Sequence, residues 1–382
     1  MFGSGNTPSF QSPHRFDGTG SNVTRSDPVG RKPVSKVERA QMNVEDGAFT
    51  FEKTDGQVRA DFERLRRLSP GDTIDKDVEW EVRTGCPTPN RLHLFRSVRA
   101  GQLLGERMHW PHRVKTSTVW CKSGQEVLDR WNRDPEFLRR ASERIERVTQ
   151  NRKFTRSGLV YDTIRSNSAL LTVTHFRATV SKYLCDVTRA ETVLDFSAGW
   201  GDRLTGFLAS DTVERIHLVD PRPGSMEACR SQYEFVGSTK GLTLHRGPAE
   251  DILPTLPTET FDLIVSSPPY FNVENYGETH SESEGQIRMK VDTVEEYVAV
   301  FLRPVITNCA RLLKPGGTLA INLDDNLRLK ILVCQTALDI ASTIPTLAFV
   351  GTAGLRKGTG FGQGSKSCTK SKAEPIYMWR RA

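Results

Sequence analysis

The sequence predicts an α/β protein whose C-terminal part forms a mostly parallel, doubly wound sheet and whose N-terminal part is an extension. Two observations predict this fold. From about residue 158 onward, short apolar runs alternate with amphipathic segments, which is typical of strands linked by helices. Polar residues follow the apolar runs directly, and the carboxyl ends of parallel strands share the edge at which such sheets bind ligands.

The alternation can be followed along the chain. A short amphipathic helix is expected at residues 176–186, before the first strand, and a longer one at residues 293–313, between the fourth and fifth strands. The seven expected strands lie in "TVLDFSAGWGDRL", "RIHLVDPRP", "LTLHRGPAEDI", "FDLIVSSPPY", "KPGGTLAINLDD", "TLAFVGTAGL" and "EPIYMWRR". We find no internal repeat.

The N-terminal extension divides into two predicted regions. Residues 1–45 are rich in Ser, Gly, Pro, Asn and Arg and poor in large apolar side chains, so we expect a disordered basic tail. Residues 46–153 form an accessory region, a candidate for substrate recognition, with a helix at residues 134–148 that Asp134 caps. Upstream, Trp110 and Trp120 are interleaved with basic residues, which predicts either a nucleic-acid contact or a small core.

Composition limits the partners and the chemistry. The 382-residue chain has a formal net charge of +7 and an isoelectric point near 9.0, which permits an anionic partner without requiring one. Its seven cysteines are scattered without CxxC spacing, so neither a metal site nor a disulfide framework is predicted. We expect an intracellular protein without a membrane span or secretory signal, because no apolar run is long enough for either.

The glycine turn "DFSAGWG" after the first strand narrows the choice of ligand. A dinucleotide site would need glycine where Leu204 stands, and no phosphate-binding lysine follows the turn. The turn resembles instead the first motif of the S-adenosylmethionine-dependent methyltransferases. Together with "SSPPY", it resembles the amino-methyltransferases that act on exocyclic nitrogens, chiefly in DNA. The resemblance covers about residues 154–382 and implies a Rossmann-like methyltransferase fold, a seven-stranded sheet and S-adenosylmethionine as the cofactor.

The resemblance also implies which residues hold the cofactor. Asp195 would accept hydrogen bonds from the methionine amino group, directly or through water, and Asp220 would accept them from the ribose hydroxyls. The full set of implied cofactor-binding residues is Phe176, Asp195, Ser197, Ala198, Gly199, Gly201, Asp220, Ala249, Glu250 and Ser266. Two positions depart from the family pattern, because Pro248 stands where aspartate is common and Trp200 where a small residue is common.

The catalytic motif implied by the resemblance consists of Ser267, Pro268, Pro269 and Tyr270. The lone pair of an exocyclic amine is delocalised into its base ring, and two acceptors that bond the amino protons push that nitrogen toward sp³ character. In the resembled family the acceptors are the side chain of the first residue and a proline carbonyl, here Ser267 and Pro268. Tyr270 would stack on a base that has been swung out of the helix.

The sequence leaves the target base open. Serine at position 267 favours cytosine N4 weakly, whereas many N4-cytosine enzymes carry the catalytic motif before the cofactor turn; the two indications conflict, so adenine N6 stays open. DNA is the favoured partner. RNA, including cap or tRNA guanine N2, and an inactive nucleic-acid-binding subunit are the alternatives. Protein-glutamine methyltransferases usually carry asparagine at the position of Ser267, which counts against that class. The oligomeric state is not predicted.

Three segments are candidates for holding the polymer: Trp110–Trp120, Asn272–Val291 and Arg356–Lys372. The last one combines a glycine-rich backbone with five cations, which favours contact with phosphates. These cations are Arg356, Lys357, Lys366, Lys370 and Lys372.

Overall fold

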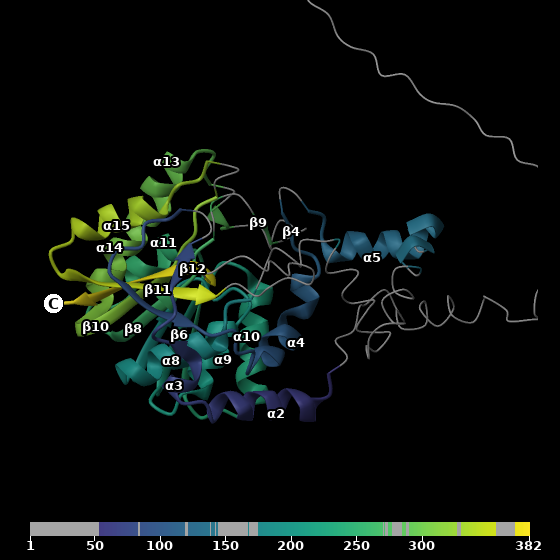
Figure 1. Ribbon diagram of the computed structural model, residues 1–382, viewed down its shortest axis with the longest axis horizontal. Helices are drawn as coiled ribbons and strands as arrows, with labels where there is room; N and C mark the ends of the chain where they lie inside the picture. The colour runs from purple at the N-terminus through teal and green to yellow at the C-terminus, as the bar shows by residue number, and fades with distance from the viewer. Residues whose placement is uncertain are drawn as a thin grey trace, which may run out of the picture.

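The computed structural model places the strands of the C-terminal part in one mixed sheet with helices on both faces (Figure 1). The structure describes residues 53–82, 85–118, 121–137, 139–141, 143, 167, 175–269, 271, 274–276, 285–287, 290–326, 330–356 and 371–382. The predicted tail at residues 1–45 therefore lies outside the described residues, as does most of the predicted helix at residues 134–148. The start of that helix is described, and Asp134 Oδ1 accepts the backbone N–H groups of Glu136 and Phe137, as expected of a cap.

Seven strands correspond to the seven that the sequence predicts. They are β5 (Thr192–Asp195), β6 (Arg215–Asp220), β7 (Gly241–Arg246), β8 (Phe261–Ser266), β10 (Leu313–Asn322), β11 (Leu347–Arg356) and β12 (Ser371–Arg381). Their order across the sheet is β11-β12-β10-β8-β5-β6-β7. The strands from β10 to β7 run parallel, whereas β12 is antiparallel to both of its neighbours β10 and β11. The predicted mostly parallel, doubly wound sheet is confirmed.

The N-terminal region adds three strands, so the predicted number of seven strands was too low. The additional strands are β1 (Ile74–Asp75), β2 (Trp80–Val82) and β3 (Arg91–Phe95). β3 pairs in parallel with β11 and β2 in parallel with β12, which makes one ten-stranded sheet. Strands of two to five residues are too short for an alternating apolar pattern to identify them in the sequence.

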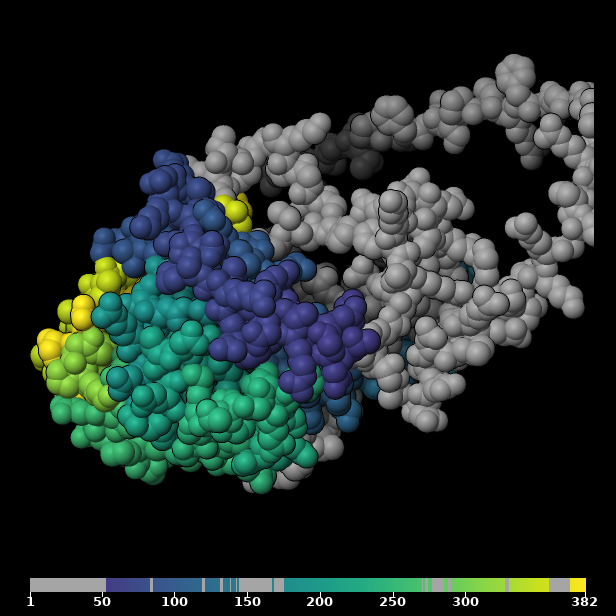
Figure 2. Space-filling model, turned by 90° about the horizontal axis from the view of Figure 1, so that it is seen from below, coloured from purple at the N-terminus to yellow at the C-terminus, as the bar shows by residue number. Residues whose placement is uncertain are grey.

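Two hydrophobic cores lie on the two faces of the sheet. One face is covered by α11 (Ala249–Ile252), the 3₁₀ turn Leu253–Thr255, α13 (Val294–Tyr297), a π-helical turn (Val298–Leu302), α14 (Arg303–Leu312) and α15 (Cys334–Ser342). The other face is covered by α2 (Asp55–Arg66), α3 (Pro70–Thr73), α4 (Gln102–Arg113), α8 (Ala178–Thr188), α9 (Asp202–Ala209) and α10 (Pro223–Phe235). Figure 2 shows the purple and blue N-terminal segment lying over the teal helices of this second face.

The remaining described elements lie beside the sheet, near its carboxyl edge. They are α5 (Gly124–Arg133) and a small antiparallel pair, β4 (Ser117–Thr118) with β9 (Glu274–Asn275). This pair joins the accessory region to the loop that follows the predicted catalytic motif (Figure 1). Every helix in the described ranges is too short or too polar to span a bilayer.

Gly206 permits the close contact between α8 and α9, and replacing it is our first prediction. A methyl group at Gly206 would overlap Ser181 Oγ and the Ala178 carbonyl oxygen, so the two helices would have to separate. We expect Gly206→Ala to lower the free energy of unfolding by about 1–3 kcal/mol, as overpacking does in other cores. Urea denaturation measures this change.

The matched control for this prediction is Gly56→Ala, on the exposed side of α2. A methyl group at Gly56 lies 3.9 Å from Thr54 Oγ1, so it fits without strain, and alanine favours the helix by up to about 1 kcal/mol. Equal effects of the two substitutions would contradict the close packing of α8 on α9.

Candidate functional site

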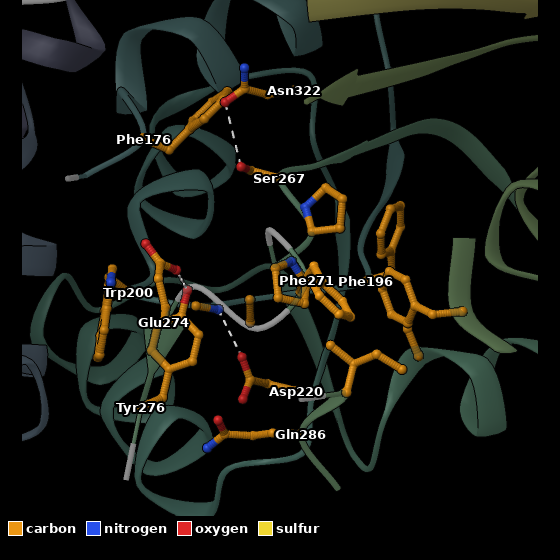
Figure 3. Close-up of a pocket in the computed structure, with 18 of the residues that line it drawn as sticks. Phe176, Phe196, Trp200, Asp220, Ser267, Phe271, Glu274, Tyr276, Gln286 and Asn322 are labelled. Carbon is orange, nitrogen blue, oxygen red and sulfur yellow. Dashed lines mark hydrogen bonds between the residues drawn. The ribbon is translucent and has the colours of Figure 1, made fainter. Parts of the chain in front are cut away.

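A cavity of about 330 Å³ opens at the carboxyl edge of the sheet (Figure 3). Its wall is built from the segments that follow β5, β6, β7, β8 and β10. This is the edge at which the sequence places its polar residues, and the volume is typical of a small-molecule site. The predicted residues Phe176, Ser197, Ala198, Gly199, Asp220, Ala249, Glu250, Ser267, Pro268 and Pro269 line the wall.

The glycine turn between β5 and α9 passes twice through left-handed backbone conformations. The φ angles are +58° at Gly199 and +66° at Gly201, which glycine adopts without strain. Gly199 lies in the cavity wall, but Gly201 does not. A methyl group at Gly201 would overlap Gln232 and approach His109 Nε2 to 2.7 Å. Gly201 therefore allows α4 and α10 to pack against the turn, and the structure does not bring it to the cavity.

Asp195 is fully buried behind the turn and is absent from the cavity wall. Its Oδ2 accepts a hydrogen bond from Arg203 Nε at 2.7 Å. Its Oδ1 accepts one from the Ser197 N–H at 3.1 Å and one from the Ser266 hydroxyl at 2.8 Å. Asp195 and Ser266, both expected at the cofactor, thus form a buried cluster that fixes the turn, while Arg203 reaches the cavity.

Asp220 lies in the wall and connects the turn to the start of α10. Its Oδ2 accepts the Gly199 N–H at 2.9 Å. Its Oδ1 accepts both the backbone N–H and the Nε of Arg222, at 3.0 and 3.1 Å. Arg222 and Asp220 are both buried, so their ion pair is shielded from solvent.

The predicted catalytic motif continues from β8 into the cavity wall. The Ser267 hydroxyl donates to Asn322 Oδ1 at 3.4 Å, and Asn322 in turn donates Nδ2 to the Pro375 carbonyl at 2.9 Å. Asn322, at the end of β10, was not predicted and is buried. Tyr270 lies outside the described residues, so its stacking role stays a prediction.

The two proline carbonyls of the motif differ in their surroundings. The Pro269 carbonyl accepts hydrogen bonds from the Tyr297 hydroxyl and the Phe271 N–H, both at 3.0 Å. Among the described residues, no donor bonds the carbonyl of Pro268, which lines the cavity. Of these two carbonyls, that of Pro268 is therefore the one available to a bound molecule.

Comparison with known families decides the class of protein. Residues 261–378, which begin at β8 and include the motif, match the family model described as DNA methylase, the N6/N4 type. The chain is a methyltransferase. The resemblance to the amino-methyltransferases is confirmed over this segment, and with it S-adenosylmethionine as the cofactor. No curated protein matches the sequence.

Solved structures of several methyltransferases resemble the chain at low similarity. NodS, an N-methyltransferase from Bradyrhizobium japonicum WM9, has 16% identity and a TM-score of 0.34, with 53% of this chain and 93% of that chain covered. TrmN from Thermus thermophilus has 16% identity and a TM-score of 0.35, with 54% and 49% covered. TomG, an O-methyltransferase from Streptomyces achromogenes solved with its cofactor, has 13% identity and a TM-score of 0.35, with 54% and 79% covered. The family match remains the deciding observation.

The cavity of the methyltransferase suits S-adenosylmethionine in size and in chemistry. We propose that Asp220 and the Gly199 backbone hold the ribose side, and that Ala249 and Glu250 contact adenine. Glu250 is held by an ion pair with Lys290 at 2.8 Å. Phe176, at the other side of the turn, lies under the Arg203 guanidinium, 5.2 Å from its ring centre, where the methionine end would be enclosed.

Glu274 and Tyr276 form a part of the methyltransferase wall that the sequence did not predict. The Tyr276 hydroxyl donates to the Glu274 carboxylate. The Arg222 guanidinium lies 4.6 Å from the ring centre of Trp200 and 4.7 Å from that of Tyr276. Such contacts gain strength when they are removed from water. Trp200, a departure from the family pattern, therefore belongs to this wall, although no spacing in the sequence links it to Tyr276.

Helix α4 supports the methyltransferase cavity from outside the predicted domain. Arg113 on α4 donates to His175, and His175 Nδ1 donates to Asp202 at 2.7 Å, next to the glycine turn. Arg113 and Trp110 are both buried, so they cannot stack bases or contact phosphates as one interpretation of this stretch required. Trp120 lies outside the described residues. The core interpretation of Trp110 is correct.

The carboxyl of Glu274 gives our second prediction. Burial raises the pKa of Glu274 to about 7, and nearby Glu374 also raises it, while Arg222 opposes the shift. The folded state therefore keeps a proton that the unfolded state releases near pH 4.5, so this group destabilises the fold as pH rises from about 4.5 to 7. The free energy of unfolding therefore falls over this pH range, and we expect Glu274→Gln to remove up to about 3 kcal/mol of that decrease.

Denaturant unfolding between pH 4.5 and pH 8 measures the effect of Glu274→Gln. Glu63→Gln, at a side chain of α2 that is 46% exposed, is the control for replacing a carboxylate at the surface. Parallel stability–pH curves for wild type and Glu274→Gln would contradict the raised pKa.

Proposed function

We propose that this methyltransferase transfers a methyl group to an exocyclic amino nitrogen of a nucleic-acid base, most favourably cytosine N4 or adenine N6 in DNA. The observation that carries the proposal is the match of residues 261–378 to the DNA methylase family, because this segment contains the wall formed by Ser267 and Pro268. S-adenosylmethionine supplies an electrophilic methyl group when it is bound.

The chain's own residues would position the amine for in-line attack. Pro268 lines the cavity, and its carbonyl, which no described residue bonds, would accept one amino proton. The Ser267 hydroxyl donates its hydrogen bond to Asn322 Oδ1, so the lone pairs of its own oxygen are left to accept a hydrogen bond from the second amino proton. The hydrogen bonds of the Pro269 carbonyl hold this backbone in place. Positioning of this kind can supply much of the rate enhancement, because methyl transfer from a sulfonium needs little acid–base help.

Labelled methyl transfer to three polymers tests the proposal. The full chain is incubated with S-adenosylmethionine carrying a tritiated methyl group and with duplex DNA, single-stranded DNA or RNA. We expect label in DNA. Label in RNA alone would favour the RNA alternative, and no label in any polymer, with the cofactor bound, would favour an inactive nucleic-acid-binding subunit.

Polymer binding by the segment Arg356–Lys372 gives our third prediction. Only its ends are described, and there Lys372 pairs with Glu81 and Arg356 with Asp75. Lys357, Lys366 and Lys370 lie outside the described residues. If these three lysines contact phosphates, their joint replacement by glutamine should reduce the salt dependence of nucleic-acid binding by roughly one unit of log–log slope for each lost contact.

Filter-binding measurements at several salt concentrations check the lysine prediction. Replacing three exposed cations of α2 and the segment after it, Arg59, Arg66 and Arg67, is the control and should leave the slope unchanged. Calorimetry should show unchanged cofactor affinity for the triple lysine variant. An unchanged salt slope would shift polymer binding to the N-terminal 150 residues.

A further inference from the structure

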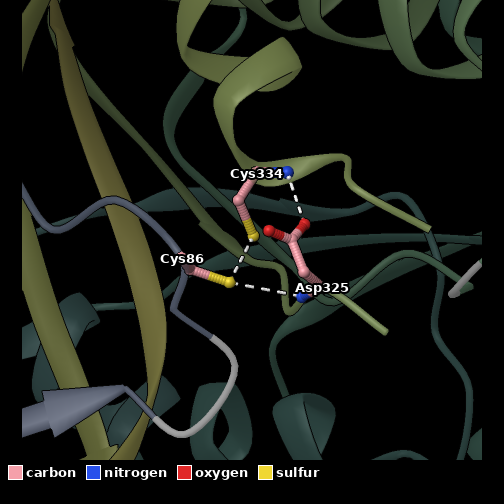
Figure 4. A group of neighbouring side chains, drawn as sticks. All are labelled: Cys86, Asp325 and Cys334. Carbon is pink, nitrogen blue, oxygen red and sulfur yellow. Dashed lines mark hydrogen bonds between the residues drawn. The ribbon is translucent and has the colours of Figure 1, made fainter. Parts of the chain in front are cut away.

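Two cysteines and an aspartate, one of the cysteines remote in sequence from the other two residues, meet at one buried point beside the cavity (Figure 4). Cys86 lies in the loop between β2 and β3, Asp325 follows β10, and Cys334 is the first residue of α15. One ligand atom from each of the three lies within 4.8 Å of those of the other two. The two sulfur atoms are 3.0 Å apart.

The surroundings of these groups favour a positive charge. Asp325 is 9% exposed, and Cys86 and Cys334 are 3% and 0% exposed. No lysine or arginine within the described ranges pairs with Asp325. A carboxylate that is buried without a cation is costly, so a cation at this point would relieve that cost.

Hydrogen bonds already orient the three groups toward one another. Asp325 Oδ1 accepts the N–H groups of Val333 and Cys334 at 2.7 and 2.9 Å, which leaves Oδ2 without a donor among the described residues. The Asp325 N–H donates to Cys86 Sγ at 3.3 Å, a contact that stabilises a thiolate ligand. Tyr377 on β12 donates to the Pro87 carbonyl at 2.8 Å and so holds the loop that carries Cys86.

We propose that Cys86, Cys334 and Asp325 bind a thiophilic divalent cation, with Zn²⁺ as the best match. Sulfur ligands select zinc over magnesium or calcium. In a tetrahedral site with Zn–S bonds of about 2.3 Å, two sulfurs lie roughly 3.7 Å apart, so the present pair needs to open by less than about 1 Å. On binding, two S–H bonds break, two Zn–S bonds form and two protons pass to solvent.

The cavity offers the route of entry and a fourth ligand. Asp324, Asp325 and Asn326 all line the cavity, so a cation can reach the carboxylates from solvent. Asp324 Oδ1 lies 3.4 Å from Cys86 Sγ and is a candidate for the fourth ligand. The cation would link the loop that carries Cys86 and the start of α15 to the segment after β10. That segment follows Asn322, the hydrogen-bond partner of Ser267. Its role is therefore structural, beside the catalytic wall.

A disulfide is the competing use of two adjacent thiols. It would need an oxidant such as hydrogen peroxide to reach two buried sulfurs, and it would make no use of the carboxylate or of the N–H···S hydrogen bond. The donor set therefore favours the cation, and the test below separates the two.

Titration of the full reduced chain with Cd²⁺ as a spectroscopic probe for zinc tests the proposal. We expect one equivalent of Cd²⁺ to bind with an ultraviolet sulfur-to-metal charge-transfer band, and one equivalent of Zn²⁺ to abolish the band by competition. Cys86→Ser and Cys334→Ser should each lower the affinity by about 100-fold or more, since even loss of an outer-shell partner costs about 10- to 100-fold. Cys121→Ser, at a half-buried cysteine outside the cluster, should bind as wild type does.

The wild-type chain alone keeps the proposal falsifiable if the variants fail to fold, because the charge-transfer band requires metal-bound thiolates. Absence of a band at saturating Cd²⁺ would overturn the proposal, as would a band that persists in both Cys86→Ser and Cys334→Ser. A Cys86–Cys334 disulfide in protein purified with zinc and without reductant, shown by peptide mass analysis, would also overturn it.

Discussion

Ser267→Ala is expected to lower the turnover number about 10- to 100-fold and to leave S-adenosylmethionine affinity within about twofold of wild type. The loss corresponds to one hydrogen bond of about 1.4–2.7 kcal/mol that is made to the amine as it attacks. Ser267 contacts Asn322 and the cavity but bonds neither Asp220 nor the glycine turn, so the proposed cofactor contacts should persist. Steady-state kinetics together with calorimetry separates the two effects.

Two further substitutions test whether the loss of turnover in Ser267→Ala comes from its hydroxyl. Ser342→Ala, at an exposed serine at the end of α15, should leave both quantities unchanged. Asn322→Ala should reproduce part of the Ser267 effect, because the serine hydroxyl would lose the acceptor that orients it. Normal turnover by Ser267→Ala would remove the hydroxyl from the proposed pair of acceptors.

Asp195→Ala is expected to cost about 3–5 kcal/mol of folding free energy. The substitution leaves the buried Arg203 without its carboxylate, and breaking a buried ion pair from one side has this magnitude in other proteins. It also frees the Ser197 N–H and the Ser266 hydroxyl, so the glycine turn should loosen and cofactor affinity should fall. We therefore propose that Asp195, which does not line the cavity, affects cofactor binding through the glycine turn.

Denaturant unfolding and calorimetry together check the Asp195 prediction. Asp262→Ala, in the same sheet and bonded to Lys314 and to the N–H groups of Glu191 and Thr192, is the control. It should cost less stability, because Asp262 is partly exposed, and it should leave cofactor affinity unchanged. Full stability of Asp195→Ala would contradict the buried cluster.

The parts of the site that the sequence predicted lie in short, continuous sequence motifs. A buried strand, a glycine turn and a helix start lie within thirteen residues of "TVLDFSAGWGDRL", so Gly199 could be placed at the cavity from sequence alone. The same holds for Ser267 and Pro268, because two prolines end β8 at a definite position. Both motifs lie at carboxyl ends of strands, and topology brings such ends together.

The parts that sequence reasoning missed depend on contacts between remote segments. Arg113 contacts His175, which bonds Asp202, and Cys86 contacts Cys334. Neither contact could be predicted from the spacing of these residues in the sequence. The partners of Asp195 were also out of reach, since only the fold brings Arg203 and Ser266 to its carboxylate. The N-terminal strands were not predicted because β1 and β2, with two and three residues, leave no periodic pattern, and the five residues of β3 give only a short one.

The position of the transferred methyl group tests the central claim most directly. The full chain is incubated with DNA and with S-adenosylmethionine whose methyl group is deuterated, and the DNA is digested to nucleosides for mass analysis, with Ser267→Ala as the matched control. The account predicts label on an exocyclic nitrogen, as N4-methylcytosine or N6-methyladenine, and much less label with Ser267→Ala. Label on a ring carbon, or equal label from the wild type and Ser267→Ala, would contradict it.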